Sequence, residues 1–358
     1  MTAAYVALEG GHVLEARGRA PGTARGELVF TTAYTGYEES LTDPSYEEQI
    51  LAFSYPLIGN YGVREERFES DRVHPRAVLA KELTEDVADW LASEGVPAVD
   101  RLDTRDVVTD IRDSGAMKCG IAVGEDVTEE DALAELEACK AMSEHTEIGE
   151  QVSVDEQTTY GADNDGETVA LVDCGAKGSI VDSLLARNAT VHVLPHDASA
   201  HDVDALEPDI LFISNGPGDP ANYEHAIDLV QAFAEDTPVA GICLGQQIVA
   251  EALGGATEKM TFGHRGVNQP VLDLESGQVV MTTQNHGYTV AEPGDHLEVT
   301  QINVNDDTPE GLDGVDYDII TRQYHPEANP GPEDTLDFFD DVLAMADARA
   351  TTAVPADD

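Results

Sequence analysis

The chain has 358 residues, a length typical of two domains, and 41% of them are apolar, which excludes a disordered chain. Its 71 acidic and 19 basic residues give a formal net charge of −52. Nucleic acid is therefore not expected as a partner, because phosphate binding needs clustered Lys and Arg. No membrane is expected either, since no apolar run reaches the roughly 18 residues of a spanning helix.

The charge also bears on the medium in which the chain folds. Only five lysines occur, and the acidic residues are spread through both halves. Such a charge opposes compaction, and about 1 M salt shortens its range to roughly 3 Å. We therefore hypothesise a salt-rich cytoplasm, as in halophiles; the alternative is a merely acidic surface. The cytoplasm is expected because residues 1–10 show no basic region followed by an apolar stretch, so no signal peptide is visible.

Residues 1–142 are predicted to form a strand-rich, mixed α/β domain. Short β-branched or aromatic runs recur there between turn signals, and a few helical segments follow Thr or Asp caps. The expected strands are 5–8, 27–32, 49–53, 77–79 and 119–123, and the expected helices are 85–93, 103 or 104 to 112, and 129–142.

Residues 143–167 are rich in Glu, Thr, Asp and Gly and are interpreted as an interdomain linker, the alternative being a decorated loop within one domain. From 168 to 346 apolar strands alternate with helices, which predicts a doubly wound α/β domain. The strands are 168–172, 190–194, 209–214 and 238–242, and the helices are 178–187, 221–234 and 244–253. Residues 347–358 are small and polar and are expected to form a frayed tail.

The motif Gly-Ile-Cys-Leu-Gly at residues 241–245 is the most informative segment. A predicted strand ends at Cys243 and a helix begins directly after it, as in the strained elbow of G-x-nucleophile-x-G enzymes. The thiol then lies at a helix N-terminus, which stabilises a thiolate, and the N–H of Leu244 can serve as an oxyanion donor. Cys243 is thus the predicted nucleophile. The remaining cysteines form no C-x-x-C pair and are interpreted as packing residues: Cys119, Cys139 and Cys174.

A cysteine nucleophile needs a base, usually a histidine that a third group orients. His325 follows a predicted strand and should lie at the carboxyl end of the sheet, where α/β active sites gather. Glu327, two residues on, can point the same way and hold the imidazole tautomer. The alternative is a solvated turn with an incidental glutamate. His286 ranks second as a base, because no carboxylate lies near it in sequence.

Three loops are candidates for supporting roles. The Gly- and Pro-rich loop at 214–220 could supply a second oxyanion donor and hold the polar end of a substrate, or be an ordinary βα turn. In residues 283–288, expected to follow a strand at 279–281, Asn285 and the Gly287 backbone could bind an amino-acid backbone. Residues 173–179 lack the spacing of a phosphate-binding loop and are interpreted as a structural turn, so no nucleotide site is expected.

Together, residues 241–245 and the His-Pro-Glu motif at 325–327 resemble the class I (triad) glutamine amidotransferase domain. The segments 35–46, 55–62, 103–106, 214–220 and 284–287 are similar to those of the small subunit family of carbamoyl-phosphate synthase. The resemblance covers nearly the whole chain apart from the linker and tail. Two departures, Gln246 and Tyr288 in place of a commoner histidine and phenylalanine, leave the triad intact.

The resemblance implies hydrolysis of L-glutamine to glutamate and ammonia through a cysteinyl thioester, catalysed by Cys243, His325 and Glu327. It implies that ammonia travels through a tunnel to a large subunit, which makes carbamoyl phosphate from bicarbonate and ATP for arginine and pyrimidine synthesis. No metal or cofactor is expected in this chain; ATP and Mg belong to the large subunit. The glutamine-binding positions implied are Ser45, Gly216, Gly218, Leu244, Gln247, Asn285, Gly287 and Tyr288.

Two other readings stay open on the residues alone. The amidotransferase could serve a different acceptor, as in guanylate or anthranilate synthesis, although segments 35–46 and 55–62 argue against it. The chain could also be a non-catalytic subunit that only docks on and regulates a synthetase, which the intact triad opposes.

Overall fold

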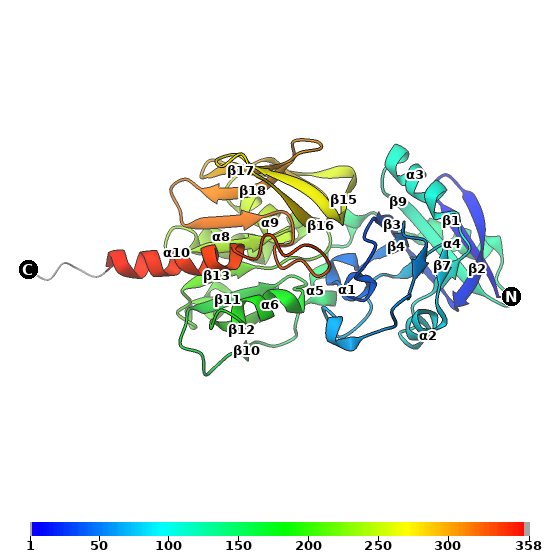
Figure 1. Cartoon of the computed structure of the whole chain (residues 1–358), viewed down its shortest axis with the longest axis horizontal. Helices are drawn as coiled ribbons and strands as arrows, with labels where there is room; N and C mark the ends of the chain where they lie inside the picture. Colours follow the sequence, from blue (N-terminus) through cyan, green and yellow to red (C-terminus); the bar gives the residue numbers. More distant parts are fainter. Residues whose placement is uncertain (1, 354–358) are drawn as a thin grey trace, which may run out of the picture. The chain divides into compact units, whose positions relative to one another are not determined.

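The computed structural model describes residues 2–353, with side chains described as far as residue 346. The chain forms two compact units, one made of residues 1–148 and 260–267 and the other of residues 149–259 and 268–358 (Figure 1). Within the described part of the chain, no helix is both long enough and apolar enough to cross a membrane.

The first unit is built on a closed barrel with the strand order β1-β2-β8-β6-β4-β3-β9. Its strands are β1 (Ala3–Leu8), β2 (His12–Ala20), β3 (Gly22–Thr31), β4 (Gln49–Phe53), β6 (Ala77–Leu79), β8 (Ala98–Asp100) and β9 (Met117–Gly124), and a separate pair is β5 (Leu57–Ile58) and β7 (Glu82–Leu83). Inward-facing aliphatic side chains such as Leu28, Ile50 and Ile121 are fully buried in one cluster, which forms the core of this unit.

The helices of the first unit are α1 (Tyr37–Thr42), α2 (Glu85–Ser93), α3 (Thr104–Ser114) and α4 (Glu129–Ala138), with short 3-10 turns η1 (Pro44–Tyr46), η2 (Glu65–Arg67) and η3 (Met142–Glu144). Asp103 caps α3 by accepting from the backbone N–H groups of Arg105 and Asp106. The predicted helix 129–142 was too long. It ends at Ala138, because Cys139 is extended and its carbonyl accepts a hydrogen bond from Lys118 Nζ at 2.9 Å.

The second unit contains a sheet with the order β10-β12-β11-β13-β14-β19-β18-β17-β15-β16. Its strands are β10 (Thr158–Tyr160), β11 (Thr168–Asp173), β12 (Thr190–Pro195), β13 (Ile210–Ile213), β14 (Val239–Ile242), β15 (Ala256–Asp273), β16 (Val279–Glu292), β17 (Leu297–Asn303), β18 (Pro309–Gly314) and β19 (Ile319–Arg322). Strands β12, β11, β13, β14 and β19 are parallel, whereas β17, β18 and β19 pair antiparallel.

Helices cover both faces of this sheet, as the predicted doubly wound domain requires. They are α5 (Ile148–Val152), α6 (Gly178–Leu185), α7 (Ala200–Asp204), α8 (Glu224–Phe233), α9 (Leu244–Ala252) and α10 (Phe338–Ala353), with one 3-10 turn, η4 (Pro220–Asn222). In Figure 1, α6 and α10 lie in front of the sheet and share a core with it, while α8 and α9 pack together behind it. From β11 the chain first adds β12 on one side and then crosses to add β13 on the other side. Open α/β sheets bind ligands at such a switch point, outside the carboxyl ends of the strands.

The expected linker and tail both contain regular secondary structure. The expected linker, residues 143–167, contains part of η3, α5 and β10, and β10 pairs antiparallel with β12. The units divide between residues 148 and 149. Helix α10 continues through Ala353, well into the segment 347–358 that was expected to be a tail, and residues 354–358 lie outside the described part of the chain.

Candidate active site

Cys243 lies at the elbow between β14 and α9. Its backbone has φ 55° and ψ −104°, a conformation that non-glycine residues rarely adopt and that is often retained at functional sites. The two flanking glycines make the turn possible. A Cβ on Gly241 would lie 2.8 Å from the carbonyl carbon of Gly245, and a Cβ on Gly245 would lie 2.2 Å from the Ile213 oxygen. The side chain is buried, and its Sγ donates to the Asn285 carbonyl at 3.6 Å.

His325 and Glu327 lie just beyond the carboxyl end of β19, the neighbour of β14. A backbone hydrogen bond of 2.8 Å from His325 N–H to the Thr283 oxygen holds the histidine. Nδ1 of the ring is 2.6 Å from Glu327 Oε1. Nε2, on the other side of the ring, has no hydrogen-bond partner among the described residues. The Cys243 side chain nevertheless raises the pKa of this ring. The structure thus brings the predicted nucleophile, base and carboxylate together.

The electrostatics of the site favour a charged ring and a charged carboxylate. Burial disfavours the imidazolium, but the Glu327 carboxylate and the Cys243 side chain outweigh burial and raise the pKa of His325 to about 10. Burial would also raise the pKa of Glu327, but Lys177 and His325 outweigh it and lower that pKa to about 2. A protonated imidazole beside a thiol is the arrangement that stabilises a thiolate.

Lys177 is a site residue that the sequence did not reveal, since residues 173–179 were interpreted only as a structural turn. Its Nζ donates to Glu327 Oε1 at 2.9 Å and to the Ala328 oxygen at 2.8 Å, and its side chain is 3% exposed. Its position at the carboxyl end of β11, as one of only five lysines in the chain, was the available signal. Lys177 supplies a buried positive charge to the carboxylate that orients the base.

The Gly- and Pro-rich loop after β13 lies beside the elbow. A Cβ on Gly216 would lie 2.0 Å from the Cys174 oxygen and 2.9 Å from Cδ2 of Leu244, so only glycine fits there. Gly218 has a φ of +93°. The loop is held by buried polar groups: Ser214 Oγ accepts from the Cys174 N–H at 2.9 Å. Gly216 and Leu244, two of the expected binding positions, are therefore neighbours.

Residues 283–288 are not a loop after a strand at 279–281, as predicted, but the middle of the long strand β16. Their polar side chains are buried and paired, which explains why the pattern resembled a loop. His286 places Nδ1 2.8 Å from the Tyr288 oxygen and Nε2 3.0 Å from Gln284 Oε1, so both ring nitrogens are occupied. Gln247, on α9, donates to the Tyr288 oxygen at 2.9 Å.

Of the remaining expected binding positions, Asn285 and Gly287 lie in the second unit and Ser45 lies in the first. Asn285 contacts the nucleophile through its carbonyl, as noted above, and Gly287 follows it by two residues in β16. Ser45 belongs to the first unit, where it is buried in η1 and its N–H donates to Asp43 Oδ1 at 2.9 Å.

The other three cysteines are buried, and burial raises the pKa of each thiol. Protonated thiols in apolar surroundings are poor nucleophiles, which agrees with their interpretation as packing residues.

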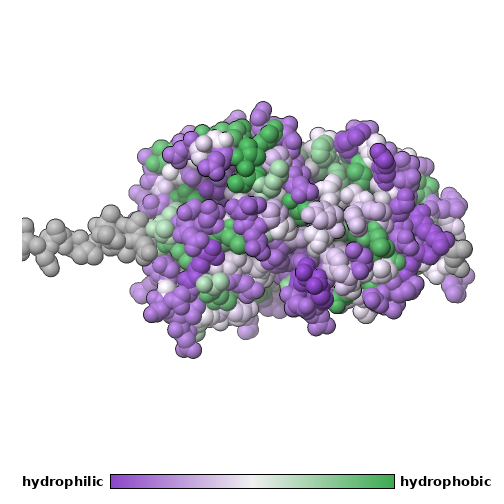
Figure 2. Space-filling model, viewed as in Figure 1, coloured by the Kyte–Doolittle hydropathy of each residue, from purple (hydrophilic) through white to green (hydrophobic). Residues whose placement is uncertain are grey.

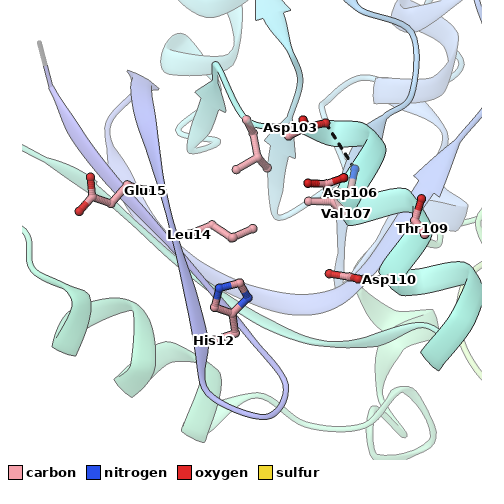
Figure 3. Close-up of a pocket in the computed structure, with 9 residues that line it drawn as sticks. His12, Leu14, Glu15, Asp103, Asp106, Val107, Thr109 and Asp110 are labelled. Carbon is pink, nitrogen blue, oxygen red and sulfur yellow. Dashed lines mark hydrogen bonds between the residues drawn. The ribbon is translucent and has the colours of Figure 1, made fainter.

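A pocket of about 410 Å³ lies in the first unit between β2 and α3 (Figure 3). Leu14, Leu102 and Val107 form its apolar part, and Glu15, Asp103, Asp106 and Asp110 surround them, together with His12 and Thr109. The four carboxylates are exposed, as is common in a chain with this charge. None of the expected site residues lines this pocket.

Comparisons with known proteins agree with the motifs at both ends of the chain. Residues 6–121 match the family model of the carbamoyl-phosphate synthase small chain, CPSase domain, and residues 170–345 match that of class-I glutamine amidotransferases. The carbamoyl phosphate synthase small chain of Halobacterium salinarum is 69% identical over 353 residues, covering 99% of both chains. Those of Archaeoglobus fulgidus and Methanocaldococcus jannaschii are 45% and 40% identical, covering 96% and 97% of this chain. On this evidence the chain belongs to the carbamoyl phosphate synthase small chain family and carries a class-I glutamine amidotransferase domain.

Proposed function

We propose that this chain hydrolyses L-glutamine to glutamate and ammonia and delivers the ammonia to the large subunit of carbamoyl-phosphate synthase. The observation that carries the proposal is the buried arrangement of Cys243, His325 and Glu327, with His325 Nδ1 2.6 Å from the carboxylate and the thiol acting on the same ring. Family membership supports the substrate and the partner.

In the first half of the reaction, the Cys243 thiolate attacks the carboxamide carbon of glutamine. The oxyanion that forms is stabilised by the Leu244 N–H and by the loop that carries Gly216 and Gly218. His325 gives its proton to the departing nitrogen, ammonia leaves, and a glutamyl thioester remains on Cys243. Glu327 keeps the ring in the required tautomer and balances its charge.

In the second half, His325 takes a proton from a water molecule as that water attacks the thioester carbon. The carbon–sulfur bond breaks, glutamate is released, and the proton returns the site to its resting state. Asn285, Gly287, Tyr288 and Gln247 are proposed to hold the glutamine.

Family membership supports a proposal for the destination of the ammonia. A large subunit that uses bicarbonate and ATP would convert it into carbamoyl phosphate, which feeds arginine and pyrimidine synthesis. ATP and Mg are proposed to bind that subunit. A regulatory subunit without catalytic activity would not need a strained elbow with a buried Cys–His–Glu set, and glutamate release from glutamine separates the two readings.

The decisive test is Cys243→Ser. A serine hydroxyl is a far weaker nucleophile than a thiolate in this setting, so glutamine hydrolysis should fall by roughly a thousandfold or more. Ammonia-dependent synthesis of carbamoyl phosphate by the complex with the large subunit should be retained. Cys139→Ser, which alters a packing cysteine, is the control. Glutamine-dependent activity that survives in Cys243→Ser would overturn the assignment.

A further inference from the structure

An apolar face covers the antiparallel part of the sheet in the second unit. Strand β15 pairs with β17 in a register that sets Leu272 beside Ile302. In the hairpin between β15 and β16, the Asp273 N–H donates to the Gln278 oxygen at 2.9 Å, which places Val279 of β16 opposite Leu272. Val279, Leu272 and Ile302 therefore form one row across the three strands. The parallel row two residues along holds Pro270, Met281 and Val304, because alternate residues of a strand share a face. We define the apolar face as Pro270, Leu272, Leu274, Val279, Met281, Ile302 and Val304.

These side chains point away from the core. Val279, Met281, Val304 and Leu274 are 52%, 46%, 48% and 48% exposed, whereas their strand neighbours Val271 and Asn303 are fully buried. Antiparallel sheets usually place polar residues on the solvated face. Figure 2 shows a continuous apolar patch where Figure 1 draws β15 and β17. Contiguous exposed apolar patches commonly mark surfaces that bind another protein.

The surroundings of the apolar face restrict what can cover it. Glu275 lies in the hairpin between β15 and β16, and Asp306 and Asp307 lie in the turn between β17 and β18; all three are exposed. In a symmetric pair of copies the same patch meets itself, so these carboxylates would face carboxylates. A different protein with an apolar centre and Lys or Arg at its rim would complement both the surface and the charge.

We propose that the apolar face is a docking surface for the large subunit, through a patch with an apolar centre and a basic rim; this rests on the proposed function, which requires that partner. Seating the partner here buries the exposed valine, leucine and methionine side chains. Apolar contacts of this kind persist in concentrated salt, and rim charges that docking brings into contact become partly buried, so salt screens them much less than exposed charges.

The test is a triple variant, Val279→Thr with Met281→Gln and Val304→Thr. All three positions are about half exposed, and threonine suits a strand as well as valine does, so the fold should be kept. The matched control replaces exposed apolar residues of the same unit outside the apolar face, Tyr160→Gln with Val315→Thr. Binding to the large subunit of the same organism would be measured by sedimentation velocity in multimolar KCl, with glutamine hydrolysis by the isolated chain measured in parallel.

The triple variant should bind the large subunit roughly tenfold more weakly or worse, while the control binds as the unsubstituted chain does. Basal glutamine hydrolysis should be unchanged in both. Equal affinity of all three proteins would overturn the docking surface while leaving the proposed function intact. Loss of self-association without loss of large-subunit binding would assign the face to a second copy and also overturn it. An unsubstituted chain that neither hydrolyses glutamine nor binds the large subunit would remove both proposals.

Discussion

At the scale of single residues, the candidate site contains three buried charged side chains in contact with one another. Lys177 contacts Glu327, Glu327 contacts His325, and all three side chains are at most 3% exposed. A buried carboxylate between two cations is stable only as long as both are present, because an unpaired charge in the interior costs several kcal/mol. The lysine therefore keeps charged the carboxylate that contacts the His325 ring.

Lys177→Met should destabilise the second unit by about 3–5 kcal/mol at neutral pH, because it leaves Glu327 without its cation. The folded-state pKa of Glu327, about 2, lies below its ordinary 4.5, so the carboxylate contributes stability above pH 4.5 that is lost as the pH falls toward 2. Without Lys177 that pKa rises, and the loss should begin at a higher pH.

Urea unfolding of the two proteins between pH 4 and pH 8 would check this expectation. Lys81→Met, which removes an exposed lysine, is the matched control and should change stability by no more than about 0.5 kcal/mol. The role given to Lys177 would be wrong if its variant unfolded like the control at every pH.

The triad and Lys177 show how far single residues can be predicted from the sequence. Cys243, His325 and Glu327 could be chosen because a glycine-flanked elbow and a His-x-Glu spacing are local patterns. Lys177 could not, because its partner lies 150 residues further along the chain and only the fold brings the segment after β11 into contact with the segment after β19. Its position after β11 and the rarity of lysine in this chain single it out, but neither identifies its partner.

At the scale of elements, the elbow depends on close contact between two backbones. The Cβ of an alanine at position 245 would lie 2.2 Å from the Ile213 oxygen at the end of β13, so helix α9 would have to move away from the sheet. Because α9 begins directly after Cys243, any such shift also moves the nucleophile.

Gly245→Ala should therefore reduce glutamine hydrolysis strongly and destabilise the fold by about 1–3 kcal/mol, as overpacking does. Gly254→Ala is the comparison: Gly254 has φ +83° but no atom near its Cβ position, so strain of roughly 1–2 kcal/mol is expected with activity retained. Steady-state kinetics and thermal unfolding of both variants distinguish the two effects. Full activity in Gly245→Ala would contradict the close packing of the elbow.

The elements themselves were predicted unevenly, for physical reasons. The strands and helices predicted between residues 168 and 253 agree with the structure to within a few residues, because buried parallel strands are continuous apolar runs. The short helix α7 was not predicted. Strand β2 (His12–Ala20) was missed because it carries two arginines, a glutamate and a glycine. Most of β16 was missed because its middle is polar, and only burial against α9 and the sheet reveals it as a strand. Tertiary packing overrides local preference in both cases.

At the scale of the whole molecule, the net charge of −52 dominates. Repulsion among 71 carboxylates disfavours the compact state at low ionic strength, and about 1 M salt reduces its range to roughly 3 Å.

The melting temperature should accordingly rise steadily from low salt to multimolar KCl. The comparison is the same chain in an uncharged osmolyte at matched water activity, which leaves the repulsion unscreened. Thermal unfolding followed by circular dichroism measures both series. A melting temperature that is the same at all KCl concentrations would show that the acidic surface has no part in adaptation to salt.

The first unit is discontinuous, and this limits how such a gene can be rearranged. Residues 260–267 return to it from the middle of β15, where the Thr261 and Arg265 carbonyls accept the N–H groups of Ala116 and Thr32, and Phe262 packs on its core. A fragment that stops at residue 148 would lack these partners. Recombination at that single boundary would therefore separate the barrel from a segment that packs on its core and bonds to its backbone.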